Sequence, residues 1–339
     1  MTKTDSRTTR MLRIIDRFPR LTVTVLGDMV ADEFVYGEIA RVSREAPVLI
    51  LKHRDRSVVP GGAANAVNNL ADLGVTVLPV GIVGDDEPGR MLLQYFRHKR
   101  VQVDGLQKLR SYRTVTKTRI LAGHTHSAQQ QVVRVDTEPE AEPRPRQVRD
   151  LITEAAGFLK TSDALLVADY GYGAATPEML KALRGSGALN ATVVTLDSRY
   201  RILEYAGCGI TAATPNEAEV EDALGERIGD DPDRLISAGD MLIEALGAEA
   251  LIITRGRDGM VAFQKKQEPV EIAIHGPDEV ADVTGAGDTV IATFTAALAA
   301  GADAETAARL ANFAGGIVVM KRGTATVSAE ELRNAVRSA

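Results

Sequence analysis

Short apolar segments alternate with helical patterns in the second half of the chain. The segments cover 164–168, 191–196, 210–213 and 250–254, and helical patterns follow over 176–185, 216–225 and 232–247. Apolar runs of this length indicate buried strands, and their alternation with helices favours a parallel sheet covered on both faces. The β-branched run at 21–26 predicts a first strand of the same sheet. Because no proline-rich linker or composition break divides the chain, we expect one α/β domain over residues 11–335.

Two earlier stretches carry a different pattern. Residues 34–52 and 112–136 alternate apolar and polar side chains. Alternation of this kind predicts half-exposed antiparallel strands that lie outside the buried sheet. We therefore expect a small β lid built from these two stretches. Residues 11–18 predict a short helix, and the polar residues 1–10 are expected to form a flexible tail.

Charge and cysteine content exclude several classes of protein. The net charge is −6, and no block of like charges supports binding to a nucleic acid. The single Cys208 leaves no internal disulfide, and the pair His124 and His126 has no third ligand nearby, so we expect no metal there. The polar start is no secretory signal and no run of 18 apolar residues occurs, so we expect a cytoplasmic protein without a membrane partner.

The most informative motif is Asp282-Val-Thr-Gly-Ala-Gly-Asp288, which opens an alanine-rich apolar helix. Unpaired amides at a helix start favour an anion, and a carboxylate in the same turn works against simple phosphate binding. The combination makes sense if Asp288 accepts a proton from a hydroxyl while the amides hold phosphoryl oxygens, which is the layout of a kinase for alcohols or sugars. The alternative is that Asp288 only caps the helix.

Other polar residues follow the predicted strands, where ligands bind in open α/β sheets. Asn216 and Glu219 fit either a helix cap or a site for hydrated Mg²⁺ and phosphate. The glycines near Thr254 could wrap a nucleotide, and small residues before Asn65 could admit a ligand or pack closely. The candidates are Asp28 and Asp32, Gly61, Gly62 and Asn65, Asp169, Asn216 and Glu219, and Thr254, Gly256 and Gly259.

Taken together and in this order, the motifs resemble the ribokinase-like (PfkB) family of carbohydrate kinases over roughly residues 20–335. The resemblance implies a three-layer α/β sandwich with a mostly parallel central sheet and a small β-sheet lid. Within the family the chain is most similar to the heptose-7-phosphate kinase branch. The segments that carry this similarity are 27–32, Ser43-Arg-Glu-Ala-Pro47-Val, 60–65, 130–136 and Gly323-Thr-Ala-Thr-Val-Ser328.

The resemblance implies a role for each matching residue. Asp288 would be the general base, with the amides of Gly285, Ala286 and Gly287 as an anion hole. Mg²⁺ and ATP would be held by Asn216, Glu219, Thr254, Gly256, Gly259 and Asn312, with Glu219 reaching Mg²⁺ through water and Asp282 helping to bind K⁺. The sugar phosphate would be held by Asp32, Gly61, Gly62, Asn65, Asp169 and the basic lid residues Lys117, Arg119 and Arg134. Exposed charges on a sheet are the alternative for those lid residues. Lids in this family often pair between subunits, which implies a homodimer.

Two departures leave the sugar open. The branch usually has Lys where this chain has Tyr172, and Pro where it has Arg44. Another sugar of the same family, such as a fructose phosphate, a ribose-like sugar or a nucleoside, is the nearest alternative, and a non-catalytic sugar-phosphate sensor is a second. A nicotinamide-dependent dehydrogenase is disfavoured because no Gly-x-Gly-x-x-Gly follows the first strand. No His-x-Gly-His motif occurs, so we expect phosphorylation without nucleotidyl transfer.

Overall fold

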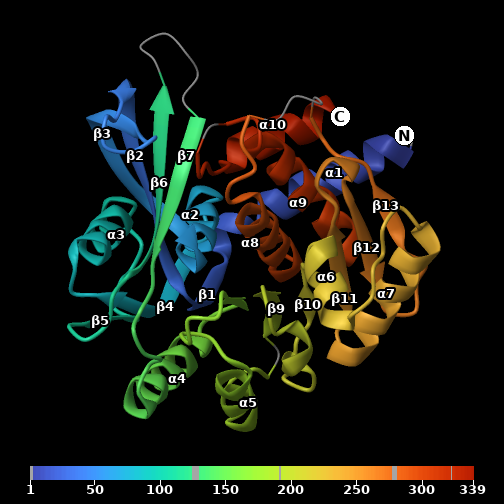
Figure 1. Cartoon of the computed structure of the whole chain (residues 1–339). Helices are drawn as coiled ribbons and strands as arrows, with labels where there is room; N and C mark the ends of the chain where they lie inside the picture. The colour runs from blue at the N-terminus through green and yellow to red at the C-terminus, as the bar shows by residue number, and fades with distance from the viewer. Residues whose placement is uncertain (1–2, 124–129, 191, 277–280, 322) are drawn as a thin grey trace.

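The computed structural model is organised around a large, mostly parallel sheet (Figure 1). It describes residues 3–123, 130–190, 192–276, 281–321 and 323–339, and within these the sheet has nine strands. Their order is β13-β12-β11-β10-β9-β8-β1-β4-β5, and the pairs β11–β12 and β12–β13 are antiparallel while the other pairs are parallel. The strands are β1 (Thr22–Gly27), β4 (Thr76–Gly84), β5 (Leu106–Leu109), β8 (Ala164–Asp169), β9 (Val193–Ser198), β10 (Ala212–Ala213), β11 (Ala250–Thr254), β12 (Met260–Gln264) and β13 (Val270–Ile272).

Helices cover both faces of this sheet because successive strand side chains point to opposite sides. In β8, Leu166 belongs to one apolar core while its neighbours Leu165 and Val167 belong to the other. The first core includes residues of α1 (Lys3–Ile15), α2 (Ala63–Asp72), α3 (Glu87–His98), α8 (Ala286–Ala299), α9 (Ala304–Val318) and α10 (Ala329–Ser338). The second includes residues of α4 (Pro145–Leu159), α5 (Pro177–Gly185), α6 (Glu217–Leu224) and α7 (Pro232–Leu246). The expected three-layer arrangement is confirmed.

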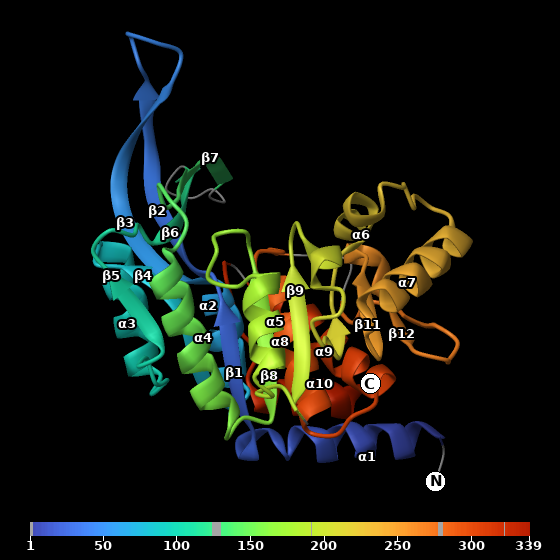
Figure 2. The same ribbon diagram turned by 90° about the horizontal axis from the view of Figure 1, so that it is seen from below.

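A second sheet, which we call the lid, projects from one side of the body (Figure 2). Its strand order is β3-β2-β6-β7. The strands are β2 (Met29–Val42), β3 (Leu49–Gly62), β6 (Val115–Gly123) and β7 (Gln130–Thr137). A single residue, Asp28, separates the end of β1 from the start of β2, and β3 runs directly into α2. The lid is thereby joined without a linker to elements that lie beside the central sheet.

The structure corrects some expected boundaries. Residues 3–10, expected to be a flexible tail, form most of α1, whose Met11, Ile14 and Ile15 are buried. Amphipathic packing therefore outweighs the polar composition of that segment. The lid strands β2 and β3 are longer than the predicted 34–52, and the segment 210–213 gives only the two-residue strand β10. His124 and His126 lie outside the described residues.

Among the described residues, no helix combines the length and the apolar character that crossing a membrane requires.

Candidate active site

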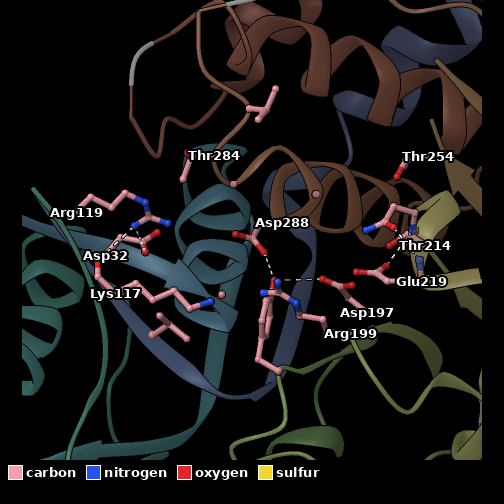
Figure 3. A pocket seen from close by; sticks show the side chains of 17 residues that line it. Asp32, Lys117, Arg119, Asp197, Arg199, Thr214, Glu219, Thr254, Thr284 and Asp288 are labelled. Carbon is pink, nitrogen blue, oxygen red and sulfur yellow. Dashed lines mark hydrogen bonds and ion pairs between the residues drawn. The ribbon is translucent and has the colours of Figure 1, made fainter. Parts of the chain in front are cut away.

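A polar cavity of about 530 Å³ lies between the lid, the carboxyl ends of the central strands and the start of α8 (Figure 3). The lid contributes Asp32, Lys117 and Arg119, and the strand ends contribute Asp197 and Thr254. The remaining lining residues are Val30, Gly62, Tyr170, Arg199, Thr214, Asn216, Glu219, Val283, Thr284, Gly285, Gly287 and Asp288. The motifs that are far apart in the sequence therefore meet at one place.

Asp288 lies in the first turn of α8 and faces this cavity. Its side chain is only 7% exposed. One carboxylate oxygen accepts a hydrogen bond from the Tyr170 hydroxyl, and the other accepts one of 2.8 Å from Nδ2 of Asn65. The N-cap of α8 is Gly285, and no side chain caps this helix. The alternative that Asp288 merely caps α8 is therefore wrong.

Burial sets the protonation behaviour of Asp288. Removal from water raises the pKa of this carboxyl to about 7, and the hydrogen bonds from Tyr170 and Asn65 act in the opposite direction. Repulsion from Asp197 and Asp32 adds to the rise. A carboxylate with a pKa near neutrality is well matched to accept a proton at neutral pH.

Gly285 is required by the geometry of this turn. Its φ of +77° lies in the left-handed region, and a Cβ atom there would lie 2.5 Å from Nδ2 of Asn65. Only glycine adopts this conformation without strain and leaves room for the side chain that holds Asp288.

The amides of this turn are only partly available to an anion. The Ala286 amide donates to the Val283 carbonyl at 3.2 Å, so in this structure it is already paired within the chain. The amides of Gly285 and Gly287 have no acceptor in the described part of the chain, and both residues line the cavity. Two of the three predicted donors therefore remain at the positive end of the α8 dipole.

Carboxylates gather on the side of the cavity formed by β9 and α6. Burial raises the pKa of Asp197 to about 7, and repulsion from Glu219 adds to this rise. Burial also raises the pKa of Glu219. Asn216 and Glu219 form a capping box, with both bonds at 2.9 Å. The helix-cap alternative for this pair is therefore confirmed, and the cap uses one Glu219 oxygen while the side chain still lines the cavity.

Cations lie on both sides of Asp288 (Figure 3). On the lid, Arg119 is paired with Asp32 at 2.6 Å, and Lys117 stands 5.7 Å above the Tyr170 ring. Burial lowers the pKa of Lys117, and repulsion from Arg199 adds to this. On the other side, Arg199 follows β9 and its guanidinium packs over the Tyr200 ring. Neither Lys117 nor Arg199 has an ion-pair partner among the described residues.

A second cavity, of about 410 Å³ and mainly apolar, adjoins the first. Thr254, Val283 and Gly287 line both cavities. The second cavity is further lined by Gly256, Arg257, Gly259, Met260, Ile274, Ala286, Val290, Asn312, Gly315, Gly316 and Val319. An apolar slot with a few polar groups beside a polar chamber suits a flat ring joined to a charged chain.

Comparison with known proteins settles the family. Residues 23–332 match the family model described as pfkB family carbohydrate kinase. The chain belongs to the pfkB family of carbohydrate kinases. The kinase is 39% identical over 332 residues to the bifunctional protein HldE of Pelobacter propionicus, covering 95% of this chain and 64% of that protein. It is 37% identical over 320 residues to the bifunctional protein HldE of Gluconobacter oxydans, covering 94% of this chain and 65% of that protein. The chain thus spans less than two thirds of the length of these relatives.

Solved structures share the fold at low sequence identity. The pfkB kinase has a TM-score of 0.76 and 17% identity to phosphofructokinase-2 from Escherichia coli, covering 94% of this chain and 99% of that one. The ribokinase of Arabidopsis thaliana, solved with ribose and ATP, gives a TM-score of 0.72 and 18% identity over the same shares. The ribokinase-like fold expected from the motifs is confirmed. As a family member, the chain is a phosphotransferase with a hydroxyl group as acceptor.

Most predicted site residues of the pfkB kinase line one of the two cavities, and five do not: Gly61, Asn65, Arg134, Asp169 and Asp282. Asp169 is buried away from them, where its carboxylate accepts from Arg201 at 2.7 Å and from Tyr205 at 2.9 Å. Arg134 is paired with Asp136 on the outer lid strand β7 and lines neither cavity. In this structure neither residue lines a cavity, so the predicted substrate contact of Asp169 and Arg134 has no support here. Asp282 accepts from the amides of Thr284 and Gly323 and also lies outside both linings.

Gly61 and Asn65 act through neighbours. A Cβ atom on Gly61 would lie 2.6 Å from the Asp32 carboxylate, so this glycine leaves room for Asp32. Asn65 holds Asp288. The sequence interpretation assigned no role to Tyr170, Asp197 or Arg199. Asp197 and Arg199 could have been found, because they follow the predicted strand 191–196 at its carboxyl end, where ligands bind.

Proposed function

We propose that this kinase transfers the γ-phosphoryl group of ATP to a hydroxyl of D-glycero-β-D-manno-heptose 7-phosphate, which gives the 1,7-bisphosphate. The identity to HldE proteins over nearly the whole chain and the branch-specific segments support this substrate. The observation that carries the reaction is the position of Asp288, a buried carboxylate at the start of α8 that faces a polar cavity beside an apolar one.

The proposed reaction balances as follows. The acceptor hydroxyl loses its proton to Asp288 while its oxygen bonds to the γ-phosphorus. The bond from that phosphorus to the β–γ bridging oxygen breaks, and ADP leaves with the electron pair. Phosphoryl transfer needs positioning and charge stabilisation more than covalent help. The amides of Gly285 and Gly287 and the Arg199 guanidinium are placed to stabilise the phosphoryl oxygens.

The apolar cavity fits the adenine and ribose of ATP. Its lining has the glycines of the Thr254–Gly259 loop on one side and α8 and α9 on the other. Nδ2 of Asn312 already donates to the Ala273 carbonyl at 2.8 Å, so the predicted adenine contact of this residue would use its oxygen or its second N–H. Because Gly287 also lines the polar cavity, the phosphates of a nucleotide bound here would point toward Asp288.

The carboxylates near α6 fit a magnesium ion. No group of three or more metal-ligating His, Cys, Asp or Glu side chains occurs among the described residues. Mg²⁺ is commonly held by one or two carboxylates, its own waters and substrate phosphates. Glu219 and Asp197 are therefore enough protein ligands for the proposed ion. Their mutual repulsion in a buried place favours a cation between them. Bound Mg²⁺ would neutralise charge on the ATP phosphates. A K⁺ site near Asp282 also belongs to the proposal.

Lys117 is the residue that we expect to grip the substrate phosphate. Lys117→Ala is expected to raise KM for the sugar phosphate by about 10–100-fold, because a charged hydrogen bond contributes roughly 1.5–3 kcal/mol. KM for ATP should change little, since Lys117 lines only the polar cavity. Arg134→Ala on neighbouring β7 is the matched control and should change neither constant. Equal effects of Lys117→Ala on both KM values would contradict the assignment.

A substrate panel tests the proposed function. The full chain is incubated with ATP, MgCl₂ and one acceptor at a time: heptose 7-phosphate, fructose 6-phosphate, fructose 1-phosphate, ribose or adenosine. ADP formation and the phosphorylated product are measured together. We expect the largest kcat/KM for heptose 7-phosphate, with one ADP per bisphosphate. A larger kcat/KM for another acceptor overturns the substrate, and sugar binding without ADP formation overturns the reaction.

The lid supports a proposed homodimer. On its outer strand β7, Val132, Val133 and Val135 are 45–51% exposed. An outer strand with exposed apolar side chains is a template for association unless it is covered. We therefore propose that two lids pair. Sedimentation of the full chain measures the mass in solution, and a monomer at micromolar concentration would refute the pairing.

A further inference from the structure

Tyr170 contacts the proposed base but has no part in the reaction as described so far. It follows β8 in the loop Tyr170-Gly-Tyr172-Gly. Its hydroxyl donates to Oδ1 of Asp288 and lies 3.4 Å from Oδ2 of Asp197. Since Asn65 donates to the other Asp288 oxygen, the carboxylate is held from two sides by elements that are far apart in the sequence.

The loop that carries Tyr170 is itself fixed. The buried Asp28 carboxylate accepts hydrogen bonds from the amides of Tyr170 at 2.8 Å, Tyr172 at 3.1 Å and Ala174 at 2.9 Å. Asp28 is 1% exposed and lies between β1 and β2. Three charge-assisted bonds to one carboxylate leave the loop little freedom, so the Tyr170 hydroxyl is placed before a substrate arrives.

We propose that Tyr170 is a positioning residue for the general base, whose hydroxyl orients the Asp288 carboxylate toward the acceptor hydroxyl and keeps it ionised. This inference rests on the proposed kinase reaction at the same site. A carboxylate has about four acceptor positions on its two oxygens, so two donors leave positions for the substrate hydroxyl. Tyr170 keeps its own proton throughout, and only Asp288 gains one.

The electrostatics agree with this role. Burial raises the pKa of Asp288 to about 7, and Tyr170 is the strongest of the influences that lower it again. Burial and the neighbouring Asp288 raise the pKa of Tyr170 well above its ordinary value, so the phenol stays a donor over the assay range. The charged or polar groups that face Asp288 are Asn65 of α2, Asp32 of β2, Lys117 of β6, Asp197 of β9, Arg199 after it, and Glu219 of α6.

The test is the pH dependence of Tyr170→Phe in the full chain. This change removes one hydroxyl and keeps the ring beneath Lys117. We expect kcat to fall about 10–100-fold, and the acid limb of the kcat profile to move up by about one pH unit, as expected for a lost hydrogen bond to a charged group. KM for ATP should stay within about twofold, because Tyr170 does not line the apolar cavity.

Tyr172→Phe is the matched control. Tyr172 lies in the same loop, but its hydroxyl donates to Glu138 at 3.1 Å and it lines neither cavity. We expect its kcat and its acid limb to match those of the wild type. If Tyr170→Phe and Tyr172→Phe shift the limb equally, or if neither does, the inference is overturned.

A second substitution protects the test against loss of folding. Replacing Tyr170 with 3-fluorotyrosine keeps the shape and makes the phenol a stronger donor, so the acid limb should move to lower pH. An unmoved limb in this protein overturns the inference even if Tyr170→Phe does not fold. Failure of the proposed function is distinguishable, since the wild-type chain would then form no ADP with any acceptor in the panel.

Discussion

Asp288→Asn is expected to lower kcat by about 10²–10⁴-fold, the usual contribution of a positioned proton acceptor. Asparagine keeps the shape of the side chain, but it cannot take the proton of the acceptor hydroxyl. Tyr170 and Asn65 donate to different oxygens of Asp288, so the single oxygen of asparagine stands in for only one of them. KM for ATP should change far less than kcat. Steady-state kinetics with heptose 7-phosphate and ATP measures both.

The dependence of wild-type activity on pH should show the titration of the Asp288 carboxyl. Because burial raises the pKa of Asp288 to about 7, the carboxylate is ionised above this pH and protonated below it. Activity should therefore fall as the pH drops through about 7, and this limb should be shallower in Asp288→Asn, where Asp197, whose pKa burial also raises to about 7, is left to titrate in this range. An acid limb near pH 4, or wild-type turnover in the variant, would refute the assignment.

Asp303→Asn provides a matched control for that substitution. Asp303 is the N-cap of α9 and accepts from the Thr306 amide at 2.9 Å, remote from the two cavities. Asparagine caps helices about as well as aspartate. Its kcat should equal that of the wild type, so a loss in Asp288→Asn alone reports on chemistry and not on charge removal in general.

Arg199→Ala should have the second-largest effect, a fall in kcat of about 10²–10³-fold, as for loss of one donor to a developing negative charge. The guanidinium lines the polar cavity and has no ion-pair partner in the described part of the chain. It lies close enough to Asp197 and Glu219 to lower the pKa of each, although burial wins for both. A cation so placed is available to the transferring phosphoryl group.

Two further variants make the Arg199 result specific. Arg199→Lys keeps the charge and should recover part of the lost kcat, though not the bidentate geometry of arginine. Arg201, two residues later, donates instead to the buried Asp169. Arg201→Ala should therefore lower the melting temperature, with little effect on kcat of the folded protein. If Arg199→Ala lowered the melting temperature and left kcat unchanged, its guanidinium would be structural.

The sequence predicted the layers and the place of the site because both depend on local patterns. Apolar runs predicted β1, β8, β9 and β11 to within two residues at each end. The glycine turn predicted the start of α8 with Asp288 in its first turn. These features follow from side-chain periodicity and from the conformational needs of glycine, which a single segment reveals.

The site residues that the sequence misplaced differ in the direction of a side chain or in its distance from the cavity. Asp169 and Tyr170 are neighbours in the sequence, yet Asp169 points to Arg201 and Tyr205 while Tyr170 points to Asp288. The motif does not tell which neighbour faces the ligand. Arg119 and Arg134 were both expected to hold the sugar phosphate, and they are register partners across β6 and β7. The sequence does not reveal that β7 is the outer strand, which places Arg134 beyond the cavity.

The shared wall of the two cavities has a practical meaning for inhibitor design. Since Thr254, Val283 and Gly287 border both chambers, the slot for a flat ring lies directly beside the chamber for anionic sugars. A single tethered compound, with a purine at one end and a phosphorylated polyol at the other, is therefore a design that would occupy both chambers. Such a bisubstrate molecule would gain from tethering, because the second half binds at the high effective concentration that the first half imposes.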